Sequence, residues 1–344
     1  MLLLFSSTIL LQGCETLRYY SQAIHGQLKI LQARQSITEV LADDSVNEHV
    51  KIKLNLITEA KQFAKQELSL PTKKLYTSYV QLDNPYVVWN VFAAPRFSVS
   101  PKTWCFPIIG CLSYRGYFAE EDAQEYATKL RKEGYDVFVG GIAAYSTLGW
   151  FDDPVLSSFF NRRDEYLAGL IFHELSHQLL YFDGDTTFNE SFATTVELEG
   201  LKRFLDHPQK KALYDNYVTS QHRRQQFIKL VIVYRDKLDK LYQLADNDET
   251  KLERKKQMLL TLKAEYRSLS QDWPNPDIYK HWFNTQLNNA KLNTLATYHS
   301  LVKPLQVLLG QHQHNLASFY KACLAMEDWD QQRRHNYLFS LKSN

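Results

Sequence analysis

The sequence predicts an α+β fold that is predominantly helical and contains one small sheet. Three observations support this fold class. Most of the chain carries apolar residues at helical spacing, three short runs between residues 86 and 141 are rich in β-branched and aromatic residues, and the stretch 210–269 contains neither glycine nor proline. A chain of 344 residues is long enough for one large domain or two closely packed ones.

The first half of the chain supplies scaffold helices and the sheet. Apolar periodicity predicts two successive helices over 17–68, and Pro71 interrupts the pattern after them. Strands are expected over 86–92, 112–118 and 135–141, which make a sheet of three to four strands. Between the last two strands, a helix over 120–133 ends at Gly134.

The second half is expected to be helical throughout. A helix over 164–182 and a helix over 190–205 come first, and two long helices over 210–269 form an antiparallel hairpin that turns near 245–248. After the break at Trp273-Pro274-Asn275-Pro276, helices are expected over 277–292 and 297–309, with a last helical region beyond His312. The change of composition near Pro208 separates a core over 14–206 from a helical C-terminal part over 207–344 packed on it.

The helix over 164–182 carries the pattern H-E-x-x-H as His173-Glu174-Leu175-Ser176-His177. Two histidines four residues apart lie on one face of a helix, so both imidazoles can reach one Zn²⁺. Glu174, next to the first histidine, can take a proton from an attacking water. The pattern therefore predicts metal-assisted hydrolysis, and the alternative is two ordinary surface histidines on an amphipathic helix.

A catalytic zinc site needs a third protein ligand, and Glu190 is the candidate. It lies thirteen residues after His177, far enough for the chain to turn and bring a second helix back beside the first. The alternative is a capping-box glutamate, because Thr187 stands three residues earlier as a possible N-cap.

These residues resemble the gluzincin metallopeptidases, particularly their aminopeptidases. The run His173-Glu174-x-x-His177 is followed by Asn189-Glu190-x-Phe192-Ala193 and then by Glu197. The resemblance implies a gluzincin-like metal helix beside the sheet, with His173, His177 and Glu190 as zinc ligands, Glu174 as general base and Glu197 as a carboxylate behind the ligands. Two features differ from that group: the spacing from His177 to Glu190 is shorter, and no G-x-M-E-N strand precedes the motif.

The same resemblance points to further site residues. An edge strand before the metal helix would pair with the substrate, which makes Gly141, Tyr145 and Ser146 the candidates, although the segment could be an ordinary connection. Asp152 and Asp153 could bind substrate or shape a turn before Pro154. For stabilising the oxyanion, Tyr298 is favoured over His299 and Tyr145.

The first residues indicate the compartment. An apolar run ends at Leu11-Gln12-Gly13-Cys14, which resembles a bacterial lipobox, so residues 1–13 would be a signal peptide and Cys14 the lipidated residue. A basic segment before the apolar run is missing, and a buried N-terminal helix is the alternative. Together with the runs 103–107 and 145–154, this start is similar to a family of bacterial lipoproteins described as predicted aminopeptidases. The expected location is the periplasmic side of the cell envelope, anchored in a membrane.

The cysteines and the net charge allow two further expectations. Cys105 and Cys111 would form a disulfide in an oxidising compartment or remain reduced in the core, and Cys323 would be a buried thiol. A net charge of +2 gives no indication of a nucleic-acid partner.

The sequence predicts a zinc-dependent peptide-bond hydrolase, an aminopeptidase acting on a peptide substrate. The alternatives are a zinc endopeptidase and a non-catalytic, lipid-anchored helical scaffold with a structural zinc. Glu174 favours an enzyme, because a structural site has no use for a base beside its ligands.

Overall fold

The computed structural model describes residues 3–73, 75–106, 110–143, 152–208, 210–296 and 300–342, with side chains from residue 15 on. The predicted fold class is confirmed: 62% of the chain is helical and the sheets have two or three strands. Two compact units form, one from residues 1–33, 86–143 and 222–296, the other from 34–85, 144–221 and 297–344. The predicted division into a core over 14–206 and a C-terminal part over 207–344 stays a prediction. Each of the two units combines segments that are distant in sequence.

Unit 1 is built around a three-stranded antiparallel sheet. The central strand β3 (Val88–Pro95) pairs with β6 (Arg115–Tyr117) on one side and β7 (Tyr135–Ile142) on the other. Alternate side chains of β3 face helix α4 (Glu120–Lys132) and form a core with it: Trp89, Val91, Ala93, Ala123, Ala127 and Leu130. Strands β4 (Trp104–Phe106) and β5 (Gly110–Leu112) form a separate ribbon in which Cys105 and Cys111 are joined by a disulfide.

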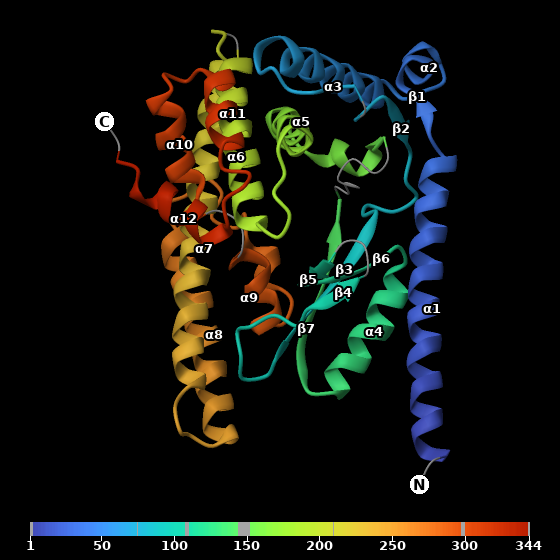
Figure 1. The fold of residues 1–344 in the computed structure, drawn as a ribbon, viewed down its shortest axis with the longest axis vertical. Helices are drawn as coiled ribbons and strands as arrows, with labels where there is room; N and C mark the ends of the chain where they lie inside the picture. Colours follow the sequence, from blue (N-terminus) through green and yellow to red (C-terminus); the bar gives the residue numbers. More distant parts are fainter. Residues whose placement is uncertain are drawn as a thin grey trace. The chain divides into compact units, whose positions relative to one another are not determined.

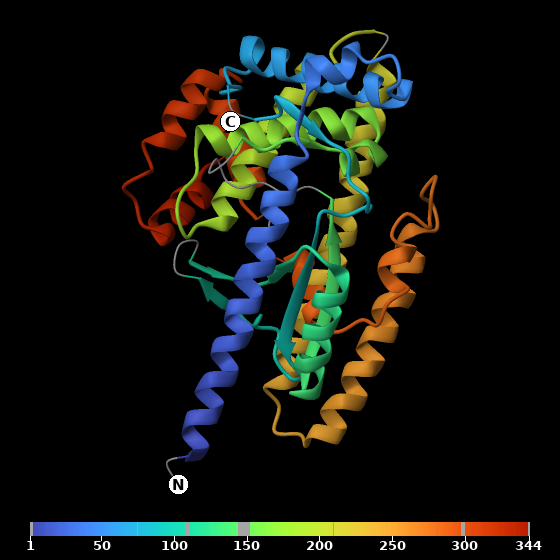
Figure 2. The ribbon, with the colours of Figure 1, turned by 90° about the vertical axis from the view of Figure 1, so that its right-hand side faces the viewer.

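Long helices complete unit 1. Helix α1 (Leu3–Gln32), drawn in blue in Figure 2, runs along β6. It is bound to α4 by Arg18, which pairs with Asp122 and Glu125 at 2.8 Å each. The predicted hairpin is confirmed as α7 (Lys211–Tyr242), from residue 222 on, and α8 (Asp248–Ser270), which share one apolar core. Among the helices with described side chains, none is long and apolar enough to cross a bilayer.

The helix expected over 277–292 is wrong. The chain instead forms a 3-10 helix, η2 (Lys280–Phe283), and then α9 (Asn289–Ala296). Asn288 explains the interruption, because its amide donates to Val137 O at 3.0 Å while its Oδ1 accepts from Lys291 N at 3.0 Å. An asparagine that binds a strand and caps the next helix starts α9 there. The strand expected over 112–118 is likewise split into β5 and β6.

Unit 2 is mainly helical. Helices α3 (Glu48–Glu67), α5 (Asp164–Leu179) and α6 (Thr186–Phe204) pack on one another, as Figure 1 shows in blue and green. The C-terminal helices α10 (Val302–Gln311), α11 (Leu316–Leu324) and α12 (Gln331–Ser340) are joined to them through α10 and α6. The rest comprises α2 (Ile37–Ala42), the short strands β1 (Gln35–Ser36), β2 (Ser78–Val80) and β8 (Val155–Leu156), and η1 (Ser157–Asn161). Buried Cys323 lies in α11.

A buried ion pair fixes α12 to the start of α6. Asp185, which is 1% exposed, accepts from the guanidinium of Arg334 at 2.5 Å and faces Nε2 of His335 at 3.0 Å. Arg334 is itself buried, and it also donates to Trp329 O at 2.8 Å. Because both charges have left water, each depends on the other for its solvation.

Replacing Arg334 by methionine is therefore expected to destabilise the protein by about 3 kcal/mol, the cost of leaving a buried charge without its partner. Urea denaturation measures this change. Arg333→Met on the same helix is the matched control: its guanidinium is exposed and lies over the Trp329 ring at 4.4 Å, so about 0.5 kcal/mol or less is expected. Equal losses in the two variants would contradict the importance of the buried pair.

Candidate metal centre

Helix α5 is held at its beginning by a lysine from another helix. Lys53 of α3 is buried and donates to Arg162 O at 2.9 Å and to Asp164 Oδ1 at 2.7 Å. Leu167, Ile171 and Leu175 form the buried face of α5. The helix ends at Leu179, three residues before the expected limit, because Leu180 is extended. Its buried face and anchored start thus fix the direction in which the two histidines point.

The start of α6 is set by Asp185 and Asn189. Asp185 is the N-cap and accepts from Phe188 N at 3.1 Å, so the capping box with Thr187 as N-cap does not form. The Asn189 amide clasps the preceding loop: its Nδ2 donates to Phe182 O and its Oδ1 accepts from Phe182 N, both at 2.8 Å. This clasp fixes the backbone one residue before Glu190.

Two glycines let α5 and α6 approach closely. A Cβ on Gly169 of α5 would lie 2.9 Å from Leu201 Cδ1 and 3.0 Å from Glu197 Oε1. A Cβ on Gly200 of α6 would lie 2.9 Å from Phe172 Cδ2. A Cβ at either position would force a neighbour to shift: the ring of Phe172 at Gly200, and the ends of the Leu201 and Glu197 side chains at Gly169.

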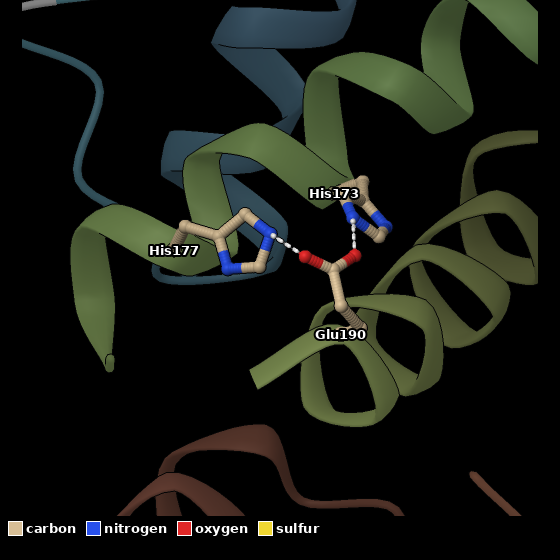
Figure 3. Close-up of side chains that lie close together, drawn as sticks. All are labelled: His173, His177 and Glu190. Atoms are coloured by element: carbon tan, nitrogen blue, oxygen red, sulfur yellow. Dashed lines mark hydrogen bonds and ion pairs between the residues drawn. The ribbon is translucent and has the colours of Figure 1, made fainter. Parts of the chain in front are cut away.

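The close packing brings His173, His177 and Glu190 together, as Figure 3 shows. Nε2 of His173 lies 3.3 Å from one oxygen of Glu190, and Nε2 of His177 lies 3.8 Å from the other. One potential ligand atom from each residue falls within 4.8 Å of the others. Two ligands of a tetrahedral zinc ion about 2.1 Å away are separated by roughly 3.4 Å, so the three side chains need to move little to share one cation.

Behind the histidines lies a second layer of polar contacts. Glu197 Oε2 is 3.1 Å from Nδ1 of His173, and Glu197 Oε1 accepts from the hydroxyl of Tyr217 at 2.8 Å. Support of this kind orients an imidazole so that its other nitrogen faces the metal. No sequence pattern points to Tyr217, which lies on α7, twenty residues beyond Glu197.

Burial and charge shift the ionisation of the whole cluster. Burial lowers the pKa of His173, but hydrogen bonds to Glu190 and Glu197 outweigh it and raise that pKa to about 10. Burial raises the pKa of Glu174 to about 7, opposed by His173 and reinforced by Glu190 and other acids. Burial and the charge of His173 lower the pKa of His177 to about 4. Without a metal, a proton on His173 therefore balances the negative charge of the carboxylates. A metal cation would supply this positive charge in its place.

The donor set fits zinc. Two imidazoles and a carboxylate are ligands that Zn²⁺ accepts, and three protein ligands leave a position open as in catalytic sites. Among the parts of the chain that are described, this is the one group of three histidines, cysteines or acids close enough to hold a metal.

The structure describes only some of the other predicted site residues. Gly141 lies in β7, an edge strand of its sheet, and pairs with Trp89. Asp153 is buried and its carbonyl accepts from Tyr76 N at 2.8 Å, which fits a role in shaping the chain. Cys14 lies in α1, and its side chain is outside the described part. Tyr145, Ser146, Tyr298 and His299 also lie outside the described residues.

Comparison with known proteins gives one result. The model of a family described as "putative aminopeptidase" matches residues 18–338, which includes all of the metal cluster. The chain belongs to this family. No curated protein and no solved structure gives a significant match. The family supports a peptidase function, and the finer resemblances to gluzincins and to bacterial lipoproteins stay predictions.

The metal-free protein is expected to lose stability between about pH 7 and about pH 10. The pKa of His173 is raised from 6.5 to about 10 by folding, so its contribution is complete below the unfolded value and disappears as the pH approaches the folded one. Denaturation in the presence of a chelator, compared with His173→Gln, isolates this residue. The stability advantage of the wild type should shrink as the pH rises; an advantage that grows would contradict the assignment.

Proposed function

We propose that this protein is a zinc-dependent peptidase that removes residues from the N-terminus of peptides. The observation that carries the proposal is that Glu190 of α6 faces Nε2 of both His173 and His177 while Glu174 lies between them on α5. Membership of the family supports peptide-bond hydrolysis as the reaction.

The residues divide into ligands and a base. His173, His177 and Glu190 would hold the zinc, which supplies Lewis-acid polarisation of the scissile carbonyl and acidifies water. Glu174 takes the proton from the water that attacks the carbonyl carbon, and then gives it to the departing amine as the C–N bond breaks. In the metal-free protein, burial and the neighbouring acids raise the pKa of Glu174 to about 7, which makes its carboxylate a stronger base than that of an ordinary glutamate. The products are the released N-terminal residue, which gains a carboxyl group, and the shortened chain, which gains a new amine.

A structural zinc site is the competing interpretation. Such a site usually fills all four positions with protein side chains, whereas three ligating side chains meet here among the described residues. The half-buried position of Glu174 next to the first ligand also favours catalysis, because a carboxylate there can transfer a proton and is not needed to hold the metal.

Glu174→Gln is expected to retain zinc and lose turnover by roughly 10²–10⁴-fold, because the substitution preserves shape but removes the base. Metal analysis and hydrolysis of aminoacyl amides measure the two effects. Glu59→Gln, an exposed substitution on α3, is the control and should match the wild type. Equal activity in the Glu174 variant and the wild type would reject Glu174 as the base.

Substrate choice separates the two kinds of peptidase. An aminopeptidase requires a free N-terminal amine, so peptides with a blocked amine should resist cleavage while unblocked ones are cut. Efficient cleavage of blocked peptides would favour the endopeptidase alternative.

We also propose that Cys14 is lipidated and anchors the protein on the periplasmic side of the bacterial envelope. The Leu11-Gln12-Gly13-Cys14 run supports lipidation. The exposed apolar side chains of α1 support contact with a membrane. One face of α1 packs on unit 1 through Tyr19 and Gln22, which contact Tyr117 and Phe118. Along the same helix, Leu17, Tyr20, Ile24 and Leu28 are spaced three or four residues apart and are between 37% and 72% exposed. An apolar stripe that starts three residues after the anchor suits a membrane surface.

Mass analysis of protein extracted from membranes should show an N-terminal, acylated Cys14. Cys14→Ser should abolish acylation and release the chain from the membrane fraction, because the acyl chains supply most of the binding energy. An uncleaved chain from the wild type, or a wild type recovered free of membranes, would contradict the proposal.

A further inference from the structure

The hydroxyl of Tyr217 lies at the far end of a hydrogen-bonded series that leads to the metal ligands. It donates to Glu197 Oε1 at 2.8 Å, and the other oxygen of Glu197 lies 3.1 Å from Nδ1 of His173. Nε2 of the same imidazole faces Glu190 at 3.3 Å. Three helices, α7, α6 and α5, each contribute one member of the series Tyr217, Glu197 and His173.

The position of the Tyr217 phenol is closely determined. Its side chain is 1% exposed, and the ring of Tyr166 packs against it with centroids 5.3 Å apart. Burial and the neighbouring charge of Glu197 raise the pKa of Tyr217 far above its usual value. The phenol therefore keeps its proton and acts as a donor to the carboxylate.

The two histidines are supported unequally. Nδ1 of His173 faces Glu197, whereas Nδ1 of His177 is buried and has no hydrogen-bond partner among the described residues. Among the described residues, Glu197 is therefore the polar partner on the Nδ1 side of a histidine ligand, whereas the polar contact of His177 is through Nε2, which lies 3.8 Å from Glu190. A group that fixes the Glu197 carboxylate consequently also fixes the imidazole of His173.

We propose that Tyr217 is a positioning residue for the metal centre: its hydroxyl holds Glu197 in the orientation that accepts Nδ1–H of His173, which leaves Nε2 free to bind the metal. The inference rests on the proposed zinc site and identifies the residue that organises it from behind. Space for the Glu197 carboxylate comes from Gly169, where a Cβ would lie 3.0 Å from Oε1.

Loss of the hydroxyl should loosen the site without dismantling it. Outer partners of a zinc-bound histidine contribute 10–100-fold to metal affinity or activity, and Tyr217 acts one step further away, so we expect Tyr217→Phe to weaken zinc binding by about 10-fold. For hydrolysis, kcat should fall more than KM rises, because Tyr217 is 1% exposed and so is out of reach of a substrate.

Tyr166→Phe is the matched control. Both substitutions remove one phenol hydroxyl from the same aromatic pair, but Tyr166 is half-buried and donates to Ser220, not to Glu197. Zinc affinity is measured by competition with a chelator in the full-length wild type and in both variants. Histidine labelled with ¹⁵N, with His173 assigned through His173→Gln, reports Nδ1–H directly in the metal-free proteins.

Zinc binding weakened in Tyr217→Phe alone, with a shifted Nδ1–H resonance of His173, would support the inference. Wild-type affinity in Tyr217→Phe would overturn it and leave the zinc peptidase proposal standing, and equal losses in both variants would overturn it in favour of general packing. If the wild type bound no zinc, the proposed function would fail. The role of Tyr217 would then be judged from the Nδ1–H resonance of His173 alone. An identical resonance in Tyr217→Phe and in the wild type would reject Tyr217 as a positioning residue as well.

Discussion

The packing of α5 against α6 is the contact on which the site depends. It brings three carboxylates, those of Glu174, Glu190 and Glu197, around two imidazoles in a largely buried space. Burying like charges together is costly unless positive charge is nearby. In the metal-free protein that charge is a proton on His173, whose pKa is raised to about 10. A divalent cation between the same groups would satisfy the same requirement, so the electrostatics and the ligand geometry point to one chemistry.

Much of unit 2 serves to hold these two helices in register. Lys53 of α3 fixes the start of α5, and the Asn189 clasp with the Asp185–Arg334 pair fixes the start of α6. The Asn189 and Asp185 bonds are buried and the Lys53–Asp164 pair is partly exposed, and together they favour a single arrangement of the site over many. Rigid support of this kind is what a hydrolytic centre needs, because the ligands and the base must keep their places while the substrate changes.

The parts of this site that the sequence predicted are those governed by local periodicity. The pattern H-E-x-x-H on a helix identified His173, Glu174 and His177 as candidates, and the structure brings Glu190 to the two histidines as a group that could hold a metal. Tyr217 could not be predicted, because its relation to Glu197 depends on how α7 packs and leaves no spacing signal. Competing side-chain bonds explain two other differences: Asp185 takes the N-cap position instead of Thr187, and Asn288 binds Val137 O and starts a new helix inside 277–292.

The most direct test of the account is anomalous scattering at the zinc absorption edge from crystals grown with zinc. The account predicts one peak about 2.0–2.2 Å from Nε2 of His173, Nε2 of His177 and an oxygen of Glu190, with Glu197 hydrogen-bonded behind His173. A peak elsewhere, or Glu190 turned away with another acid in its place, would contradict it.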